Sequence, residues 1–127
     1  MQTGRFSEYG APSTPLRAPP SNVSAVAQGT DTVRVTWDTA ATWVTGDFYD
    51  IYVLDASGAP AWGPVRVHDD TGSKDVVGLT PGATYSFQVQ YTRVRNGNYE
   101  DGPISWPTGP VTTMSATGDP YVRALLQ

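Results

Sequence analysis

The stretch GLTPGATYSFQVQY, from Gly78 to Tyr91, decides the fold of this 127-residue chain. From Tyr85 onward, apolar side chains occupy every second position and polar side chains stand between them. A two-residue period is typical of a β-strand with one face in a core and the other in solvent. The Pro-Gly pair ahead of the strand is typical of a turn. The stretch therefore predicts a turn followed by one strand of a half-buried sheet.

The rest of the chain repeats this pattern of short alternating segments and turns. Strands are predicted at residues 21–28, 33–37, 47–55, 64–68, 74–79, 85–92 and 110–114. The segment RNGNYEDGP, residues 95–103, is predicted to be a loop because it is rich in turn-forming residues. Seven short strands without a convincing helix predict an all-β protein with a seven-stranded β-sandwich.

Composition limits the classes of partner. A hydrophobic fraction of 39% fills one core, which predicts one domain. The 8 basic and 12 acidic residues give a net charge of -4, which argues against nucleic acid and anionic membranes as partners. The absence of cysteine excludes disulfides and thiolate metal sites. No apolar run is long enough for a secretory signal or for membrane insertion.

Three regions are predicted along the chain. Residues 1–18 form an extended Pro-rich arm, residues 19–117 the sandwich, and residues 118–127 a short C-terminal tail. Apolar residues are spaced along the arm between basic ones, a pattern that fits a peptide docking on a neighbouring protein. The expected anchoring residues are Arg5, Phe6, Tyr9, Leu16 and Arg17.

Three segments carry a resemblance to a known family, namely VRVTW ending in Trp37, YDIYV, and LTPGATY with Leu79 and Tyr85. Through them the chain, from about residue 18 to residue 117, resembles a fibronectin type III domain, and Leu79 and Tyr85 match the tyrosine corner of that family. The resemblance implies that the Tyr85 hydroxyl bonds to upstream backbone, and nothing in the family's pattern implies catalysis. The loop at 95–103 lacks the Arg-Gly-Asp triplet that some members use to bind integrins. The expected core residues are Trp37, Tyr49, Ile51, Leu79, Tyr85, Phe87 and Val89.

Candidate catalytic and metal-binding residues are few. The single histidine, His68, precedes Asp69 and Asp70 in a predicted turn, and no nucleophile motif accompanies it. Three acidic pairs could contribute calcium ligands, but acids beside turns more commonly cap them. These pairs are Asp47 with Asp50, Asp69 with Asp70, and Glu100 with Asp101. The interpretation is a non-enzymatic protein with no metal and no cofactor.

Aromatic and polar residues in two loops form the candidate binding site. Trp43 and Tyr99 are expected at the same pole of the sandwich, where they could make one patch. The full candidate set is Trp43, Asn98, Tyr99, Glu100 and Asp101. In the alternative, Trp43 and Trp106 fold back as lids over the open end of the sandwich. Trp62 is expected in a connection at the opposite pole.

Two classes of function remain. The first is a bacteriophage virion accessory protein, a capsid decoration or tail-associated protein made in the host cytoplasm. Its arms would bind the capsid or tail lattice, and its sandwich would stabilise the particle or adhere weakly to a host-surface protein or glycan. The alternative is an extracellular spacer, adhesion or carbohydrate-binding module of a secreted bacterial enzyme or surface protein. A second copy of the chain, in a homo-oligomer, is a further expected partner.

Overall fold

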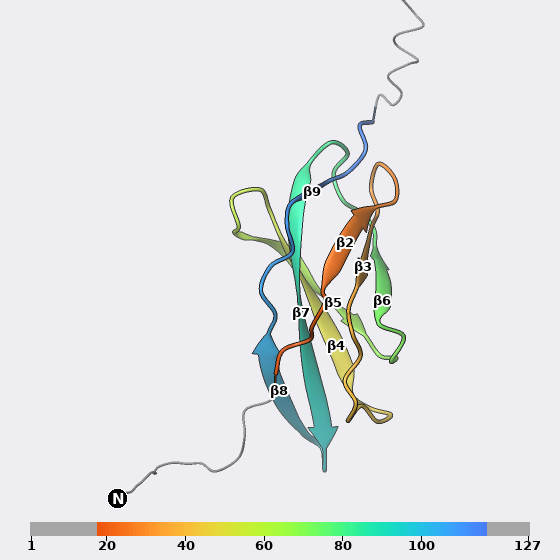
Figure 1. The fold of residues 1–127 in the computed structure, drawn as a ribbon, viewed down its shortest axis with the longest axis vertical. Helices are drawn as coiled ribbons and strands as arrows, with labels where there is room; N and C mark the ends of the chain where they lie inside the picture. The colour runs from red at the N-terminus through yellow and green to blue at the C-terminus, as the bar shows by residue number, and fades with distance from the viewer. Residues whose placement is uncertain (1–17, 117–127) are drawn as a thin grey trace, which may run out of the picture.

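The computed structural model describes residues 18–116 and shows a β-sandwich (Figure 1). The strands are β2 (Ser24–Ala27), β3 (Val33–Thr36), β4 (Phe48–Leu54), β5 (Pro60–Val67), β6 (Ser73–Val76), β7 (Thr84–Arg95), β8 (Asn98–Ile104) and β9 (Val111–Thr112). Residues 18–116 contain no helix long and apolar enough to span a membrane. The prediction of an all-β sandwich is confirmed. The expected anchoring residues of the arm, and the tail at 118–127, lie outside the described residues.

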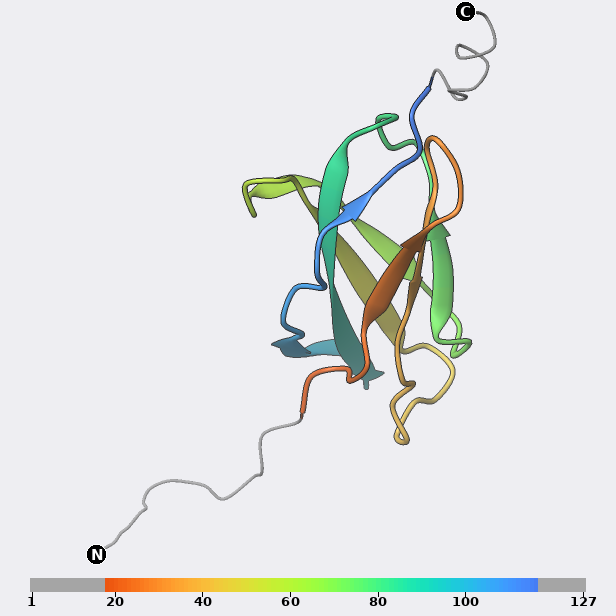
Figure 2. The same ribbon diagram turned by 45° about the horizontal axis from the view of Figure 1, so that its top comes forward.

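The strands form two antiparallel sheets that pack face to face. The smaller sheet has the order β2-β3-β6, and the larger has the order β5-β4-β7-β8 with β9 paired to the first residues of β7. Figure 2 shows the two layers, with residue 18 at one end of the sandwich and residue 116 at the other. The end that holds the β3–β4 loop (37–47) and the β7–β8 turn (96–97) is called the lower pole, as drawn in Figure 1.

The core consists of apolar side chains from alternate strand positions, which meet between the sheets. In β4, Ile51 and Val53 are 0% and 1% exposed. The ring of Tyr49 lies 5.3 Å from that of Trp37 and 5.4 Å from that of Tyr91, measured between centroids. All seven expected core residues belong to this buried cluster: Trp37, Tyr49, Ile51, Leu79, Tyr85, Phe87 and Val89.

The crossing from β6 to β7 is fixed by a tyrosine corner. The Tyr85 hydroxyl accepts a hydrogen bond from the Thr80 backbone N–H at 2.9 Å, while its ring is 8% exposed in the core. Leu79 is buried beside it, and its N–H donates to the Asp31 carbonyl at 3.0 Å. These bonds join the β6–β7 connection to both sheets. The tyrosine corner predicted from the sequence is confirmed.

The segment at 95–103 differs from its prediction as a loop. β7 continues to Arg95, turns at Asn96 and Gly97, and returns as β8, which brings the strands in the described region to eight. Asn96 and Gly97 have φ angles of 54° and 78°, as a two-residue hairpin turn requires. The loop prediction is wrong because Gly102, Pro103 and the nearby acids resemble turn residues, although the Asn-Gly pair is itself a strong hairpin signal.

Between β8 and β9 the chain stays beside β7 without regular strand pairing. The N–H groups of Ser105 and Thr108 donate to the carbonyls of Val89 and Phe87 at 3.0 and 2.9 Å, and the side chains of Ser105 and Thr108 accept the N–H groups of β7 in return. Ser105 Oγ accepts the N–H of Val89 at 2.9 Å, and Thr108 Oγ1 accepts the N–H of Phe87 at 3.1 Å. A buried N–H without a partner would be destabilising. The strand edge is thus interrupted without unpaired donors at these positions, and Trp106 stands 87% exposed between the two side chains.

Replacing Tyr85 with Phe should lower the free energy of unfolding by about 1 to 2 kcal/mol, because the Thr80 N–H loses its acceptor while the ring stays in the core. Urea denaturation measures this change. Tyr52→Phe is the matched control, since that hydroxyl bonds to Gln90 on the outer face. Its effect should be within about 0.5 kcal/mol. An equal loss in both variants would contradict the corner's role.

Ser105→Ala should lower the free energy of unfolding by about 1 to 3 kcal/mol, because the buried N–H of Val89 loses its acceptor. Thr112→Ala removes an exposed hydroxyl that bonds to Thr84, so it serves as the control with a much smaller effect. Amide hydrogen exchange gives a second readout, because the Val89 amide should exchange faster only in the Ser105 variant. Unchanged exchange at Val89 would count against side-chain capping of β7.

Candidate functional site

The β3–β4 loop at the lower pole is held by tyrosine hydroxyls that reach out of the core. The Ala40 N–H donates to the Tyr49 hydroxyl at 2.8 Å, and this hydroxyl donates to Asp70 at 2.8 Å. The hydroxyls of Thr42 and Tyr91 lie 3.3 Å apart. Burial raises the pKa of Tyr49, which therefore keeps its proton as a donor. Core tyrosines thus hold the β3–β4 loop in place.

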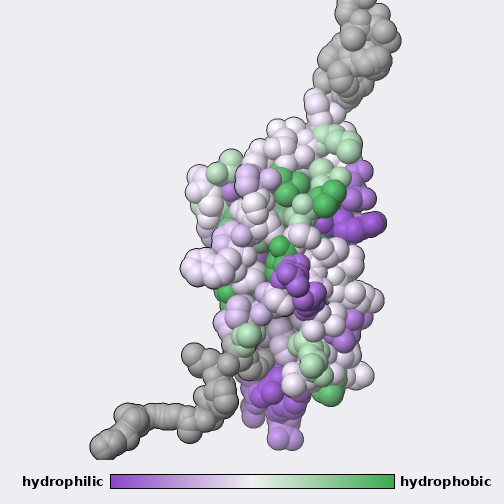
Figure 3. All heavy atoms as spheres, in the orientation of Figure 1, coloured by the Kyte–Doolittle hydropathy of each residue, from purple (hydrophilic) through white to green (hydrophobic). Residues whose placement is uncertain are grey.

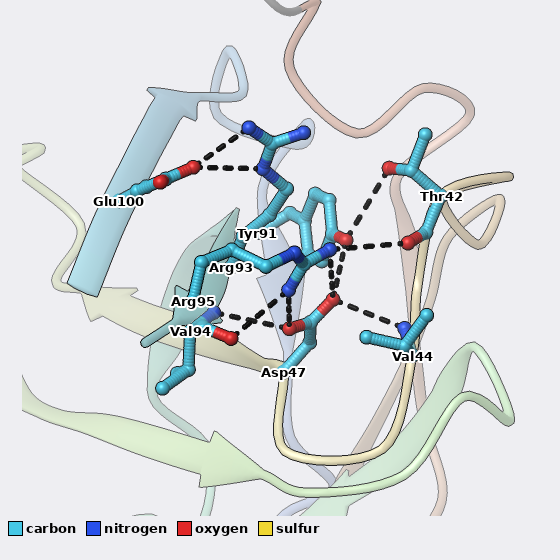
Figure 4. Close-up of polar contacts among 8 residues, drawn as sticks. All are labelled: Thr42, Val44, Asp47, Tyr91, Arg93, Val94, Arg95 and Glu100. Carbon is cyan, nitrogen blue, oxygen red and sulfur yellow. Dashed lines mark hydrogen bonds and ion pairs between the residues drawn. The ribbon is translucent and has the colours of Figure 1, made fainter. Parts of the chain in front are cut away.

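Asp47 is the hub of the lower pole (Figure 4). Its carboxylate is 0% exposed and accepts hydrogen bonds from the Tyr91 hydroxyl at 2.7 Å and from Arg95 Nη1 at 2.6 Å. The backbone N–H groups of Val44 and Val94 donate to it at 3.1 and 3.0 Å. Burial acts to raise the pKa of Asp47, but the bonds from Arg95, Tyr91 and the backbone outweigh it and hold that pKa well below its usual range. Asp47 therefore stays ionised and ties the loop to β7.

The β7–β8 hairpin carries its own paired charges. Arg93 donates to Glu100 at 2.7 Å, as Figure 4 shows, and the Thr92 hydroxyl donates to Asp101 at 2.8 Å. Two of the expected ligand-contacting acids are therefore engaged within the hairpin. Asn98 is exposed beside the turn. These bonds join the side chains of β7 to those of β8.

An aromatic cluster covers part of the outer face of the larger sheet near the lower pole. Phe48 points away from the core yet is only 3% exposed, because the Arg66 guanidinium lies 3.8 Å above its ring. The rings of His68 and Tyr99 also contact it, with centroids at 6.0 and 5.5 Å. Asp50 holds Arg66 through two bonds of 2.9 and 3.0 Å. These five residues are called the outer-face cluster.

The structure separates the two aromatic residues expected to share one patch. Trp43 is half-buried against the core, whereas Tyr99 is 63% exposed in the outer-face cluster. The alternative in which Trp43 folds back onto the sandwich is confirmed, but the same alternative is wrong for Trp106, whose side chain is exposed. Trp62 lies within β5 and not in a connection, because β5 begins earlier than predicted.

Sequence reasoning did not find Phe48 and Arg66. Phe48 is one residue away from the inward-pointing Tyr49 of β4, so its side chain points outward, and a large aromatic side chain there is expected to be buried by a neighbouring side chain. That signal is readable in the sequence. The identity of the cover is not, because Arg66 meets Phe48 only through the pairing of β4 with β5.

The acidic pairs considered as calcium ligands are engaged in other bonds. Asp47 and Asp50 face arginines, and Asp69 accepts the N–H and hydroxyl of Thr71. Among residues 18–116, no group of three or more His, Cys, Asp or Glu could hold a metal ion. His68 is exposed beside Phe48. The side chains at this pole are aromatic rings, amides and paired charges.

Asp47→Asn should lower the free energy of unfolding at pH 7 by about 3 kcal/mol, because it leaves Arg95 and several donors around a neutral group. The pKa of Asp47 is lower in the folded than in the unfolded chain, so its contribution is complete above about pH 4 and is lost as pH falls further. The difference between wild type and variant should therefore shrink below pH 4. Denaturation across pH measures this. Asp75→Asn is the control, because Asp75 lies in an exposed ion pair with Arg34, and its free energy of unfolding should stay close to that of the wild type at any pH. If the destabilisation by Asp47→Asn did not change with pH, the pairing of Asp47 would be contradicted.

Comparisons with known proteins agree with this geometry. The sequence model of the fibronectin type III domain matches residues 18–110. Human contactin 1 contains a fibronectin type III domain that is 20% identical, covers 87% of each chain and has a TM-score of 0.63. A domain of Drosophila Lar is 24% identical over 78% of this chain and 100% of its own, with a TM-score of 0.53. One from human collagen alpha-1(XX) is 20% identical over 84% and 92%, with a TM-score of 0.57.

A search of curated protein sequences gave no match. The solved relatives are below 25% identity, so they support the fold and say nothing further about the partner of this chain. The family match spans more than half of the sequence and includes the tyrosine corner seen in the structure. The chain belongs to the fibronectin type III family.

Proposed function

We propose that this chain is a non-catalytic binding module, in which the sandwich is a rigid spacer and exposed aromatic side chains contact the partner. The observation that carries the proposal is the support beneath Tyr99. Its ring is 63% exposed and makes an edge contact with Phe48, over whose ring the Arg66 guanidinium lies. A ring fixed in this way loses little conformational entropy on binding. Rigid aromatic anchors are the side chains that dominate protein recognition surfaces.

The surface of the sandwich fits a limited contact. On the face shown in Figure 3, hydrophobic side chains form small separate patches within a largely polar surface. Permanent interfaces bury large continuous apolar areas. A patchy surface fits a module that makes one localised contact and otherwise stays in solvent.

The finer hypothesis is that this module sits on a virion, anchored by residues 1–18 to a capsid or tail lattice. Its support is the sequence of the arm, where Phe6, Tyr9 and Leu16 are spaced between Arg5 and Arg17. The alternative location is extracellular, as a spacer or adhesion module. The solved relatives show only the fold, which is compatible with both locations.

Removal of residues 1–17 should abolish co-sedimentation with particles from the native source, while the thermal unfolding midpoint stays within a few degrees of that of the full chain. The reason is that the core and both sheets lie within the described residues. Immunogold electron microscopy of the same source locates the protein. Regular arrays on particles support the virion hypothesis, and labelling of cell envelopes or secreted material supports the alternative. Full co-sedimentation without the arm would overturn the anchor.

Tyr99→Ala tests the binding face separately from the anchor. It should weaken adhesion of the full chain to cells or envelope fragments without loss of the folded state. Trp106→Ala is the matched control, since that side chain is more exposed and lies outside the outer-face cluster. If Tyr99→Ala and the control adhered equally well, Tyr99 would not be a binding residue and the proposed function would lose its support.

A further inference from the structure

A hollow of about 370 Å³ lies on the outer face of the larger sheet, beyond the outer-face cluster. It crosses the sheet from β5, over β4 and β7, to the end of β8. The residues that matter for its chemistry are Tyr52, Leu54, Trp62, Pro64, Gln88 and Ile104. Its volume is in the range of small-molecule sites, which are mostly apolar with a few polar groups.

A bulge in β5 bends the strand beside this hollow. Ile51 pairs with Val65 and Val53 pairs with Trp62, so two residues of β5 stand opposite one residue of β4. Such an insertion bends a strand and redirects its side chains. Gly63 lies within the bulge at a φ of 100°, which a residue with a side chain rarely adopts. The bulge belongs to the backbone, so the hollow does not depend on a mobile loop.

The lining of the hollow is uncharged, in contrast to the neighbouring cluster. The outward residues of β4 change character along the strand, with Asp50 at the lower end, paired to Arg66, and Tyr52 and Leu54 at the upper end. The polar side chains among its lining residues include those of Tyr52 and Gln88, and none of the lining residues is charged. An anionic or cationic ligand would lose its hydration there without a counter-charge.

The polar atoms of the hollow are held in place. The Tyr52 hydroxyl donates to Gln90 at 2.7 Å, and the Gln88 amide nitrogen donates to the Ser105 carbonyl at 3.0 Å. The Trp62 side chain is 43% exposed and Ile104 is 44% exposed, on opposite sides of the hollow. An exposed indole beside fixed amide and hydroxyl groups combines a flat apolar plate with hydrogen-bonding partners.

We propose that this hollow binds a neutral polysaccharide, with Trp62 packed against the apolar face of one sugar ring and Gln88 and Tyr52 bonded to its hydroxyls. This inference rests on the proposed function, because it names the ligand class of a non-catalytic binding module. Neutral sugars match the uncharged lining and combine apolar C–H faces with hydroxyl groups. The ligand lies across the strands, from the β5 edge towards Ile104.

The test is affinity electrophoresis of the full chain in native gels that contain β-1,4-glucan, xylan, mannan or α-glucan, with pectate and heparin as charged polymers. At least one neutral polymer should retard the chain, and the charged polymers should not. Trp62→Ala should weaken the retarding association by roughly tenfold or more. Ile104→Asp places a charge at the rim and should weaken it as well. Trp106→Ala, an exposed tryptophan outside the hollow, should bind as the wild type does, and thermal unfolding checks that each variant is folded.

The outcomes separate this inference from the proposed function. Retardation by no neutral polymer, retardation by charged polymers only, or equal retardation of folded Trp62→Ala and wild type would each overturn the polysaccharide site. If adhesion to cells then still depends on Tyr99, the binding-module function stands and only the hollow is misassigned. Loss of the Tyr99 dependence together with failure of the polymers would overturn both.

Discussion

The hydrogen bonds of β7 are the constraint on which the rest of the structure depends. The strand runs for 12 residues, and each of its edges needs partners. One edge pairs with β4, whereas the other is shared among β9, the backbone and side chains of Ser105 and Thr108, and β8. The same strand carries the corner tyrosine, inward core residues, and the Tyr91 and Arg95 that hold Asp47. A change in its register would move all of these together, because a slip of one residue exchanges the two faces.

Most of the fold was readable from the sequence because its signals are local. The alternation after Tyr85, and the spacing of Leu79 to Tyr85, each depend on a few neighbouring residues and the faces of a strand. β8 was missed where two local signals competed, with the Asn96-Gly97 turn favouring a hairpin and Gly102-Pro103 favouring a loop. Long-range pairing with β7 decides the matter, since Arg93 meets Glu100 and Thr92 meets Asp101 only in the hairpin.

The candidate site was less predictable because its bonds join distant positions. From the sequence, Asp47 was considered only as a possible calcium ligand, and no residue near it in the sequence indicates that Arg95 is its partner. Side-chain direction has the same difficulty. Trp43 and Tyr99 were both expected in loops at one pole, but Tyr99 lies in β8 against the outward Phe48, while Trp43 packs against the core. Sequence reasoning assigned the pole correctly and could not assign the faces.

Both proposed contact sites lie on the outer face of the larger sheet. In its lower part the charged groups are paired within the chain, since Arg66 donates to Asp50 and Thr92 donates to Asp101, and the ring of Tyr99 is exposed against Phe48. Its upper part has no charges within the hollow and presents Trp62 beside a bulged strand. Both parts are built on strands and not on loops, so recognition by either one requires little reorganisation. Because both parts include outward residues of β4, a ligand that crosses the strands in the hollow and a partner bound at Tyr99 would be neighbours on one face of the sheet.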